Sequence, residues 1–157
     1  MTPAILDLER RGVTHVVRRY QLRGDEGGGS YGEAVAAAIG VEPERLFKTL
    51  VAELSTGELV VAVVPVSGSL DLRALAAAAG TKSAAMAAPA AAEKATGYVT
   101  GGISPFGQRR RLRLFVDASA DRHPALFVSA GKRGLQVEVS PRDLVGEAGT
   151  VVAGLAR

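Results

Sequence analysis

Residues 125–139 read Ala-Leu-Phe-Val-Ser-Ala-Gly-Lys-Arg-Gly-Leu-Gln-Val-Glu-Val, and this stretch decides how the chain is expected to fold. Apolar residues at its start predict a strand, and the Gly-Lys-Arg-Gly sequence at 131–134 is typical of a turn. From Leu135 to Val139 apolar and polar residues alternate, which is the period of a strand with one buried face. The stretch therefore predicts a β-hairpin, the clearest in the chain.

Outside this hairpin, capped helices and short strands follow one another along the chain. Thr2 before a proline, Ser30 three residues before a glutamate, and Asp71 before Leu72 are typical of helix starts. Alanines between 74 and 95 add high helix propensity. The predicted helices cover 3–11, 31–39, 72–79, 89–95 and 141–145. The predicted strands cover 13–20, 47–53, 59–64 and 112–117, a flexible loop covers 24–29, and 151–155 fits helix or strand.

Length and composition predict a single α/β (α+β) domain over residues 1–157. The chain has 157 residues, 47% of them hydrophobic, and shows neither an internal repeat nor a linker. Its mean hydropathy is +0.17. No apolar run approaches the roughly 20 residues of a membrane-spanning helix, and the N-terminal residues are charged rather than signal-like. We therefore expect a cytoplasmic protein without a membrane partner.

The numbers of cysteines, histidines and charged residues limit which kinds of site the chain can form. The chain has no cysteine and only two histidines, which argues against disulfides, a thiolate nucleophile and a metal site, and we expect neither metal nor cofactor. The formal net charge is +3, and basic residues concentrate at 18–19, 109–113 and 132–133. Such clusters fit an anionic partner or an ordinary solvated face.

Residues 100–108 read Thr-Gly-Gly-Ile-Ser-Pro-Phe-Gly-Gln and precede three arginines. Paired glycines let a backbone approach a ligand closely, and arginines neutralise phosphates. Taken alone, this segment predicts a cradle for a phosphate-bearing substrate.

Lys48 lies among apolar residues in a predicted strand, a position at which a lysine is uncommon because burial of its charge is unfavourable. Its stem could reach from a sheet face to water, and this ordinary interpretation is narrowly favoured by the residues alone. A serine hydrolase would need Ser104 or Ser129 beside His15 or His123, and the Gly-x-Ser-x-Gly elbow of many hydrolases does not occur. The remaining candidate site consists of backbone donors, cations and hydroxyls, without an obvious nucleophile.

Four separated blocks together resemble the YbaK family of Cys-tRNA(Pro) deacylases, which are related to the editing domain of bacterial prolyl-tRNA synthetases. The blocks cover nearly the whole chain, and they read Val-Glu-Pro-Glu-Arg-Leu-Phe-Lys-Thr-Leu at 41–50, Val-Val-Pro-Val-Ser-Gly-Ser-Leu-Asp-Leu at 63–72, Thr-Gly-Tyr-Val-Thr-Gly-Gly-Ile-Ser-Pro at 96–105 and Val-Ser-Ala-Gly-Lys-Arg-Gly-Leu at 128–135. The resemblance implies a compact fold around a mixed, partly barrel-like sheet with surrounding helices. It also implies cleavage of the aminoacyl ester of mischarged tRNA(Pro), without a cofactor.

The resemblance also implies site residues. In the family the lysine that matches Lys48 is the key active-site residue, and the substrate's own thiol is thought to attack the ester. Lys48 would orient the terminal adenosine or its phosphate, while backbone amides of residues 101–104 in the Gly-Gly-Ile-Ser-Pro loop at 101–105, called the glycine loop below, position the ester. The implied catalytic residues are Lys48, Gly101 and Gly102. The implied substrate-binding residues are Tyr20, Tyr31, Thr49, Ile103, Ser104, Pro105, Ser129 and Gln136, and tRNA would contact Arg109, Arg110, Arg111, Lys132 and Arg133.

One departure and several alternatives remain open. Well-known members carry an aspartate where this chain has Gln136, which keeps hydrogen bonding but loses a charge. Sister branches clear alanine or other small amino acids. A non-catalytic tRNA-binding or synthetase-associated module and a small-molecule hydrolase are the competing functions. The partner is an aminoacyl-tRNA, recognised alone or through a bound prolyl-tRNA synthetase.

Overall fold

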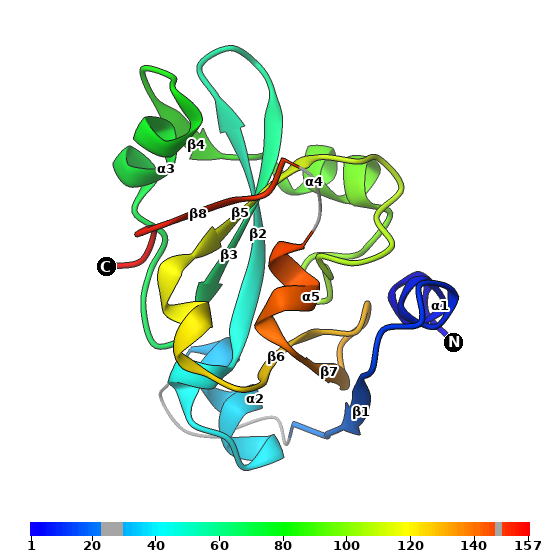
Figure 1. The fold of residues 1–157 in the computed structure, drawn as a ribbon. Coiled ribbons are helices and arrows are strands. Elements are labelled where there is room, and N and C mark those ends of the chain that lie inside the picture. The colour runs from blue at the N-terminus through cyan, green and yellow to red at the C-terminus, as the bar shows by residue number, and fades with distance from the viewer. Residues whose placement is uncertain (23–29, 147–148) are drawn as a thin grey trace.

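A mixed five-stranded sheet runs through the centre of the computed structural model, which describes residues 1–22, 30–146 and 149–157 (Figure 1). Its order is β4-β2-β3-β5-β8, in which β2 and β3 form an antiparallel hairpin and the β3–β5 and β5–β8 pairs are parallel. These strands are β2 (Phe47–Leu54), β3 (Leu59–Pro65), β4 (Ala84–Met86), β5 (Arg113–Asp117) and β8 (Val151–Ala153). The expected mixed sheet is confirmed.

A second, antiparallel sheet has the order β1-β7-β6, with β1 (Val16–Arg19), β6 (Leu126–Ser129) and β7 (Leu135–Val139). The β6–β7 pair is the hairpin that the sequence predicts, with Val128 opposite Val137. The two sheets meet where Leu46 and Phe127 form a parallel bridge. The partly barrel-like character is therefore that of two sheets joined at one corner.

The helices begin where the sequence places their caps. Thr2 and Ser30 accept hydrogen bonds from the backbone amides of Ile5 and Glu33, and the carboxylate of Asp71 caps its helix in the same way. The five α-helices in the described ranges are α1 (Pro3–Arg10), α2 (Tyr31–Ile39), α3 (Leu72–Ala79), α4 (Pro89–Thr96) and α5 (Pro141–Val145), with 3₁₀ turns at Pro43–Arg45 and Ala118–Arg122. None of the helices described is long and apolar enough to cross a membrane.

Buried side chains on both faces of the central sheet form the core. Phe47, Val61 and Val116 pack with α1 and the second sheet, while Leu75 and Phe115 pack in the cluster beneath α3. Figure 1 shows α3 at one end of the central strands and α2 at the other.

The buried carboxylate of Asp117 fixes the C-terminal segment to the end of β5. It accepts hydrogen bonds from the amides of Leu155 and Ala156, at 2.7 and 3.0 Å, and from the amide and hydroxyl of Ser119. Burial opposes its charge, but these hydrogen bonds outweigh burial and hold the pKa of Asp117 below its usual value.

The structure corrects one expectation, adds one strand that was not predicted, and decides between the two alternatives left open for the C-terminal segment. The first strand begins at Val16 rather than Val13, because the amide of Val13 donates to Leu8 and ties this residue to the end of α1. The alanine-rich stretch contains the strand β4, which pairs with β2. Residues 151–153 form a strand. The loop predicted at 24–29 lies outside the described residues.

Candidate active site

A cavity of about 640 Å³ lies along the edge of β2 that faces away from β3. Its walls come from the start of α2, from β2, from the segment between β4 and α4, from the glycine loop and from the β6–β7 hairpin. The lining residues named below include Tyr31, Lys48, Thr49, Met86, Ala87, Gly101, Ile103, Ser129 and Gln136. The walls are mostly apolar, and Lys48 is the one charged residue among those that line the cavity in the described ranges.

The cavity exists because β2 lacks a neighbouring strand along part of this edge. β4 pairs only with Ala52–Leu54, and the bridge at Leu46 joins the other end of β2 to β6. Leu46 accepts from Val66 and Leu54 donates to Glu58, so the even-numbered residues of β2 exchange backbone hydrogen bonds with β3. The N–H and C=O of Thr49 consequently point toward the open edge.

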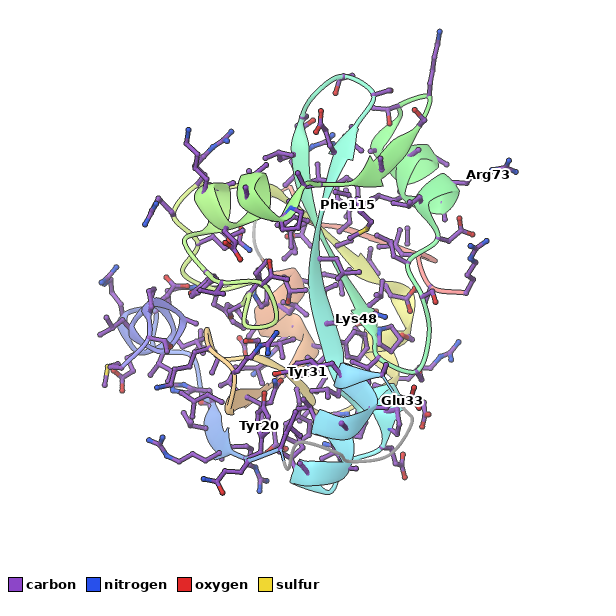
Figure 2. The ribbon with its side chains drawn as sticks, turned by 180° about the vertical axis from the view of Figure 1, so that it is seen from behind. Tyr20, Tyr31, Glu33, Lys48, Arg73 and Phe115 are labelled. Carbon is purple, nitrogen blue, oxygen red and sulfur yellow. The ribbon has the colours of Figure 1, made fainter. Side chains whose placement is uncertain are left out.

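Lys48 is half-buried on β2 beside α2, the helix that carries Tyr31 and Glu33 (Figure 2). Burial lowers the pKa of Lys48 below its usual value, and the negative charge of Glu33 opposes this shift. An ammonium that has lost part of its water interacts more strongly with an anionic ligand than an exposed one does. The surroundings of Lys48 therefore suit a binding group more than a simple surface lysine.

Two buried oxygen atoms of residues that line the cavity have no hydrogen-bond partner in the part of the chain that the structure describes. They are Thr49 Oγ1 on β2 and Gln136 Oε1 on β7, and both residues line the cavity. Ser129, directly opposite Gln136 in the β6–β7 pair, also lines it and accepts a hydrogen bond from the amide of Gly131 at 3.1 Å. This part of the wall offers acceptors to a ligand.

Aromatic and cationic side chains form the rim. The guanidinium of Arg133 lies 5.0 Å from the ring centroid of Tyr31, and the hydroxyl of Tyr31 is 3.2 Å from that of Tyr20. Burial and the contact with Tyr20 raise the pKa of Tyr31 above its usual value, so this phenol stays neutral. Tyr20 is not a lining residue and reaches the cavity only through Tyr31.

The glycine loop packs tightly on the β6–β7 turn. Gly101 has a φ of +92°, and a Cβ there would lie 2.6 Å from Arg133 Nε. A Cβ on Gly102 would lie 2.8 Å from the Cα of Lys132, while the amide of Gly102 donates to the carbonyl of Val99. Gly101 thus belongs to the cavity wall, whereas Gly102 supports the wall from behind.

Two predicted substrate-binding residues of this loop lie away from the cavity. Ser104 is fully buried; its hydroxyl accepts from the amide of Phe106 and its carbonyl accepts from Gln108. Pro105 lines a different cavity, of about 470 Å³. Both residues shape the loop, and neither is among the residues that line the cavity beside Lys48.

The predicted tRNA-binding residues divide into two groups. Lys132 and Arg133 are exposed in the β6–β7 turn, next to the glycine loop. Arg109, Arg110 and Arg111 are exposed where the chain passes the end of α4, and the last two line the cavity that contains Pro105. The arginine run is therefore separate from the rim of the cavity beside Lys48.

The serine–histidine alternative has no support from the geometry. His123 packs edge-on against Phe47 at 6.3 Å between ring centroids, and a ring nitrogen of His15 lies 2.7 Å from the carbonyl of Val13. Neither histidine lines the cavity that contains Ser129. In the described ranges no group of three or more acidic or histidine side chains is arranged to hold a metal ion.

Two features of the site were not predicted from the sequence: the charged neighbour of Lys48 and one wall of the cavity. Glu33 was identified only as a capping residue, although it is the charged neighbour that acts on Lys48. Met86 and Ala87 form a wall in the alanine-rich stretch, for which the sequence indicated only helix propensity. Pro89 keeps the preceding Ala88 out of the helical region, at φ −59° and ψ 139°, but no signal in the sequence places this segment against β2.

Comparison with known sequences identifies a family. Residues 26–146 match the model of the family described as "Aminoacyl-tRNA editing domain". The chain is 41% identical over 113 residues to "Putative Cys-tRNA(Pro)/Cys-tRNA(Cys) deacylase EbsC" of Enterococcus faecalis, a match that covers 72% of this chain and 69% of EbsC. It is 28% identical over 112 residues to YwhH of Bacillus subtilis, covering 71% of each protein.

Solved structures share the fold. The crystal structure of hypothetical protein APE2540 superposes with a TM-score of 0.86 at 24% identity and covers 99% of each chain. A "putative trans-editing enzyme for prolyl tRNA synthetase" superposes with a TM-score of 0.83 at 23% identity, covering 99% of this chain and 95% of the other. At these identities the likeness shows the shared fold alone.

Proposed function

The chain belongs to the aminoacyl-tRNA editing domain family, and from this premise we propose that it is a deacylase that cleaves the ester of mischarged tRNA(Pro), with cysteine as the preferred acyl group. Deacylation would take place in trans, on a tRNA released by its synthetase. The name of the relative EbsC supports this substrate. Cytoplasmic action and contact with prolyl-tRNA synthetase are parts of the same proposal.

The observation that carries the proposal is the composition of the cavity wall. Lys48 is present, but the lining residues in the described ranges include no histidine, cysteine, aspartate or glutamate. Such a site can bind an anion and hold an ester, yet it offers no strong general base. The attacking group must then come from water or from the substrate.

A cysteinyl ester supplies its own nucleophile. Its sulfur attacks the ester carbonyl carbon, the bond from that carbon to the ribose oxygen breaks, and the thiol proton ends on the ribose oxygen. The products are free tRNA and the cyclic thiolactone of cysteine. A thiol held beside its own carbonyl has a high effective molarity, so positioning by an apolar pocket can supply much of the rate.

The backbone donors for this reaction are the amides of Gly101 and Ile103. Both residues line the cavity, and neither amide donates to a partner within the described ranges. The amide of Gly102 is occupied by Val99, so we do not assign it to the oxyanion. Lys48 would hold the terminal phosphate or adenosine, while Lys132 and Arg133 at the rim would contact the tRNA backbone.

The test is release of free tRNA from tRNA(Pro) charged with cysteine, alanine or serine. We expect Cys-tRNA(Pro) to be cleaved fastest and Lys48→Ala to slow cleavage by about 100-fold, the order expected for loss of an electrostatic contact to the reacting substrate. Lys82→Ala is the matched control, because Lys82 is exposed between α3 and β4. Undiminished cleavage by Lys48→Ala would refute the assigned role, and binding without turnover would identify a non-catalytic module.

A further inference from the structure

The side-chain oxygens of Thr49 and Gln136 are buried hydrogen-bond acceptors that a ligand in the cavity could use. Gln136 is 7% exposed, so its amide is removed from bulk water, yet Oε1 has no donor within the described ranges. Thr49 Oγ1, on the central sheet, is likewise buried without a hydrogen-bond donor in the described ranges. Leaving a buried acceptor without a donor costs about 1–3 kcal/mol, and a ligand that donates hydrogen bonds to it recovers this energy.

The size of the cavity limits which part of the substrate can supply the donor. A volume of about 640 Å³ admits an aminoacyl group with its ribose, but not the body of a tRNA. The acyl group is the end of the substrate and therefore enters farthest. Its α-amino group is the one strong hydrogen-bond donor that every unblocked aminoacyl group carries.

We propose that Gln136 Oε1 and Thr49 Oγ1 form a neutral binding site for the α-amino group of the aminoacyl ester, with Gln136 as the residue that reads this group. The proposal rests on the proposed function. The carbonyl of Thr49, which faces the same open edge of β2, is a third acceptor. The site recognises an unblocked aminoacyl group without a carboxylate in the cavity.

The absence of a carboxylate from the described lining has a physical advantage. Lys48 is half-buried in the same cavity, and a second positive charge must enter with the substrate. An aspartate near Lys48 would form an ion pair with it when the cavity is empty, and the substrate would have to break that pair. Neutral acceptors add no negative charge to that of Glu33, which acts on Lys48 from outside the lining, and so leave Lys48 available for the phosphate or ribose.

The experiment measures binding of two adenosine ligands that cannot be hydrolysed. Both carry an amide in place of the ester at the 3′ position; one bears an alanyl group and the other a propionyl group, which lacks only the amino group. We expect calorimetry to show the alanyl ligand binding wild-type protein about 10-fold or more tightly than the propionyl ligand. In Gln136→Leu and Thr49→Val this ratio falls toward one, mainly through weaker binding of the alanyl ligand.

Each outcome separates the two proposals. If wild-type protein binds both ligands equally, the α-amino site is overturned while the deacylase assignment stands. The same conclusion follows if Gln136→Leu keeps the full preference for the alanyl ligand. If neither ligand binds, the proposed function fails with it. Both variants should fold, because each removes an oxygen that has no partner in the described structure, and thermal unfolding checks this.

Discussion

The guanidinium of Arg133 lies over the ring of Tyr31, 5.0 Å from its centroid, and so connects the β6–β7 turn to the first residue of α2. The same guanidinium occupies the space that a Cβ on Gly101 would need. Arg133 thereby contacts two sides of the cavity mouth at once.

Replacing this arginine should weaken tRNA binding and loosen the rim. For Arg133→Ala we expect the slope of log affinity against log salt to fall by about one, because one phosphate contact is lost. Arg133→Lys should restore the slope but not the ring contact, which contributes about 0.5–1 kcal/mol. Arg73→Ala is the matched control, since Arg73 is exposed on α3 at the other end of the molecule (Figure 2). Fluorescence anisotropy with labelled tRNA measures these slopes, and equal slopes in Arg133→Ala and wild type would contradict the contact.

The loop glycine that lies behind the wall should tolerate no side chain. In Gly102→Ala the new Cβ would approach the backbone of Lys132 at 2.8 Å, so the glycine loop or the hairpin must shift. We expect a loss of about 1–3 kcal/mol in the free energy of unfolding by urea, together with slower deacylation. Gly154→Ala is the control, because a Cβ there meets no atom within 4 Å. Equal stability of the two variants would show that the contact can relax.

The charge of Lys48 should depend on its neighbour on α2. Burial lowers the pKa of Lys48 below the usual 10.5 and Glu33 opposes that shift, so Glu33→Gln should lower it further. Binding that needs the ammonium should consequently weaken at a lower pH in Glu33→Gln than in wild type. A pH titration of the ¹³Cε resonance of Lys48, assigned with Lys48→Met, measures both values. A titration midpoint at or above 10.5 in wild type would contradict this account.

The carboxylate of Asp117 should make stability depend on acidity. Its folded pKa lies below the unfolded value of about 3.9, so the stabilisation is fully present above that value and is lost as pH falls through the folded pKa. At pH 7 Asp117→Asn should lower the free energy of unfolding by about 1–3 kcal/mol, because an amide presents donors to amides. The difference from wild type should shrink below pH 4. Urea unfolding at several pH values tests this, with the exposed Asp121→Asn as control.

Local chemistry made much of the fold predictable. The helix over 31–39 and the helix over 141–145 were predicted to the residue, because a capping serine and a proline mark their starts. The hairpin over 125–139 was predictable from alternation and glycines. β4 was not, because three alanine-rich residues carry no strand signal and become a strand only by pairing with the edge of β2.

The site was less predictable, since it depends on contacts between distant segments. Lys48 could be singled out by its apolar neighbours, and the resemblance to a family gave it a role that remains a proposal. That Gly102 and Ser104 face away from the cavity depends on the turn of the loop, which sequence spacing does not encode. The influence of Glu33 on Lys48 needs α2 to lie beside β2, and no local pattern predicts that packing.

The open edge of β2 between the bridge at Leu46 and the strand β4 has a consequence for how this fold can change. A segment that paired with β2 beside Thr49, between the bridge at Leu46 and the hydrogen bond from Ala87 to Val51, would close the sheet and gain backbone hydrogen bonds, but it would fill the cavity. Substitutions that lengthen β4 toward the glycine loop should therefore give a sturdier protein with no room for a ligand. In this chain the cavity occupies the place that a further strand beside β2 would take. A substitution that completes the sheet therefore gains stability and loses the binding site.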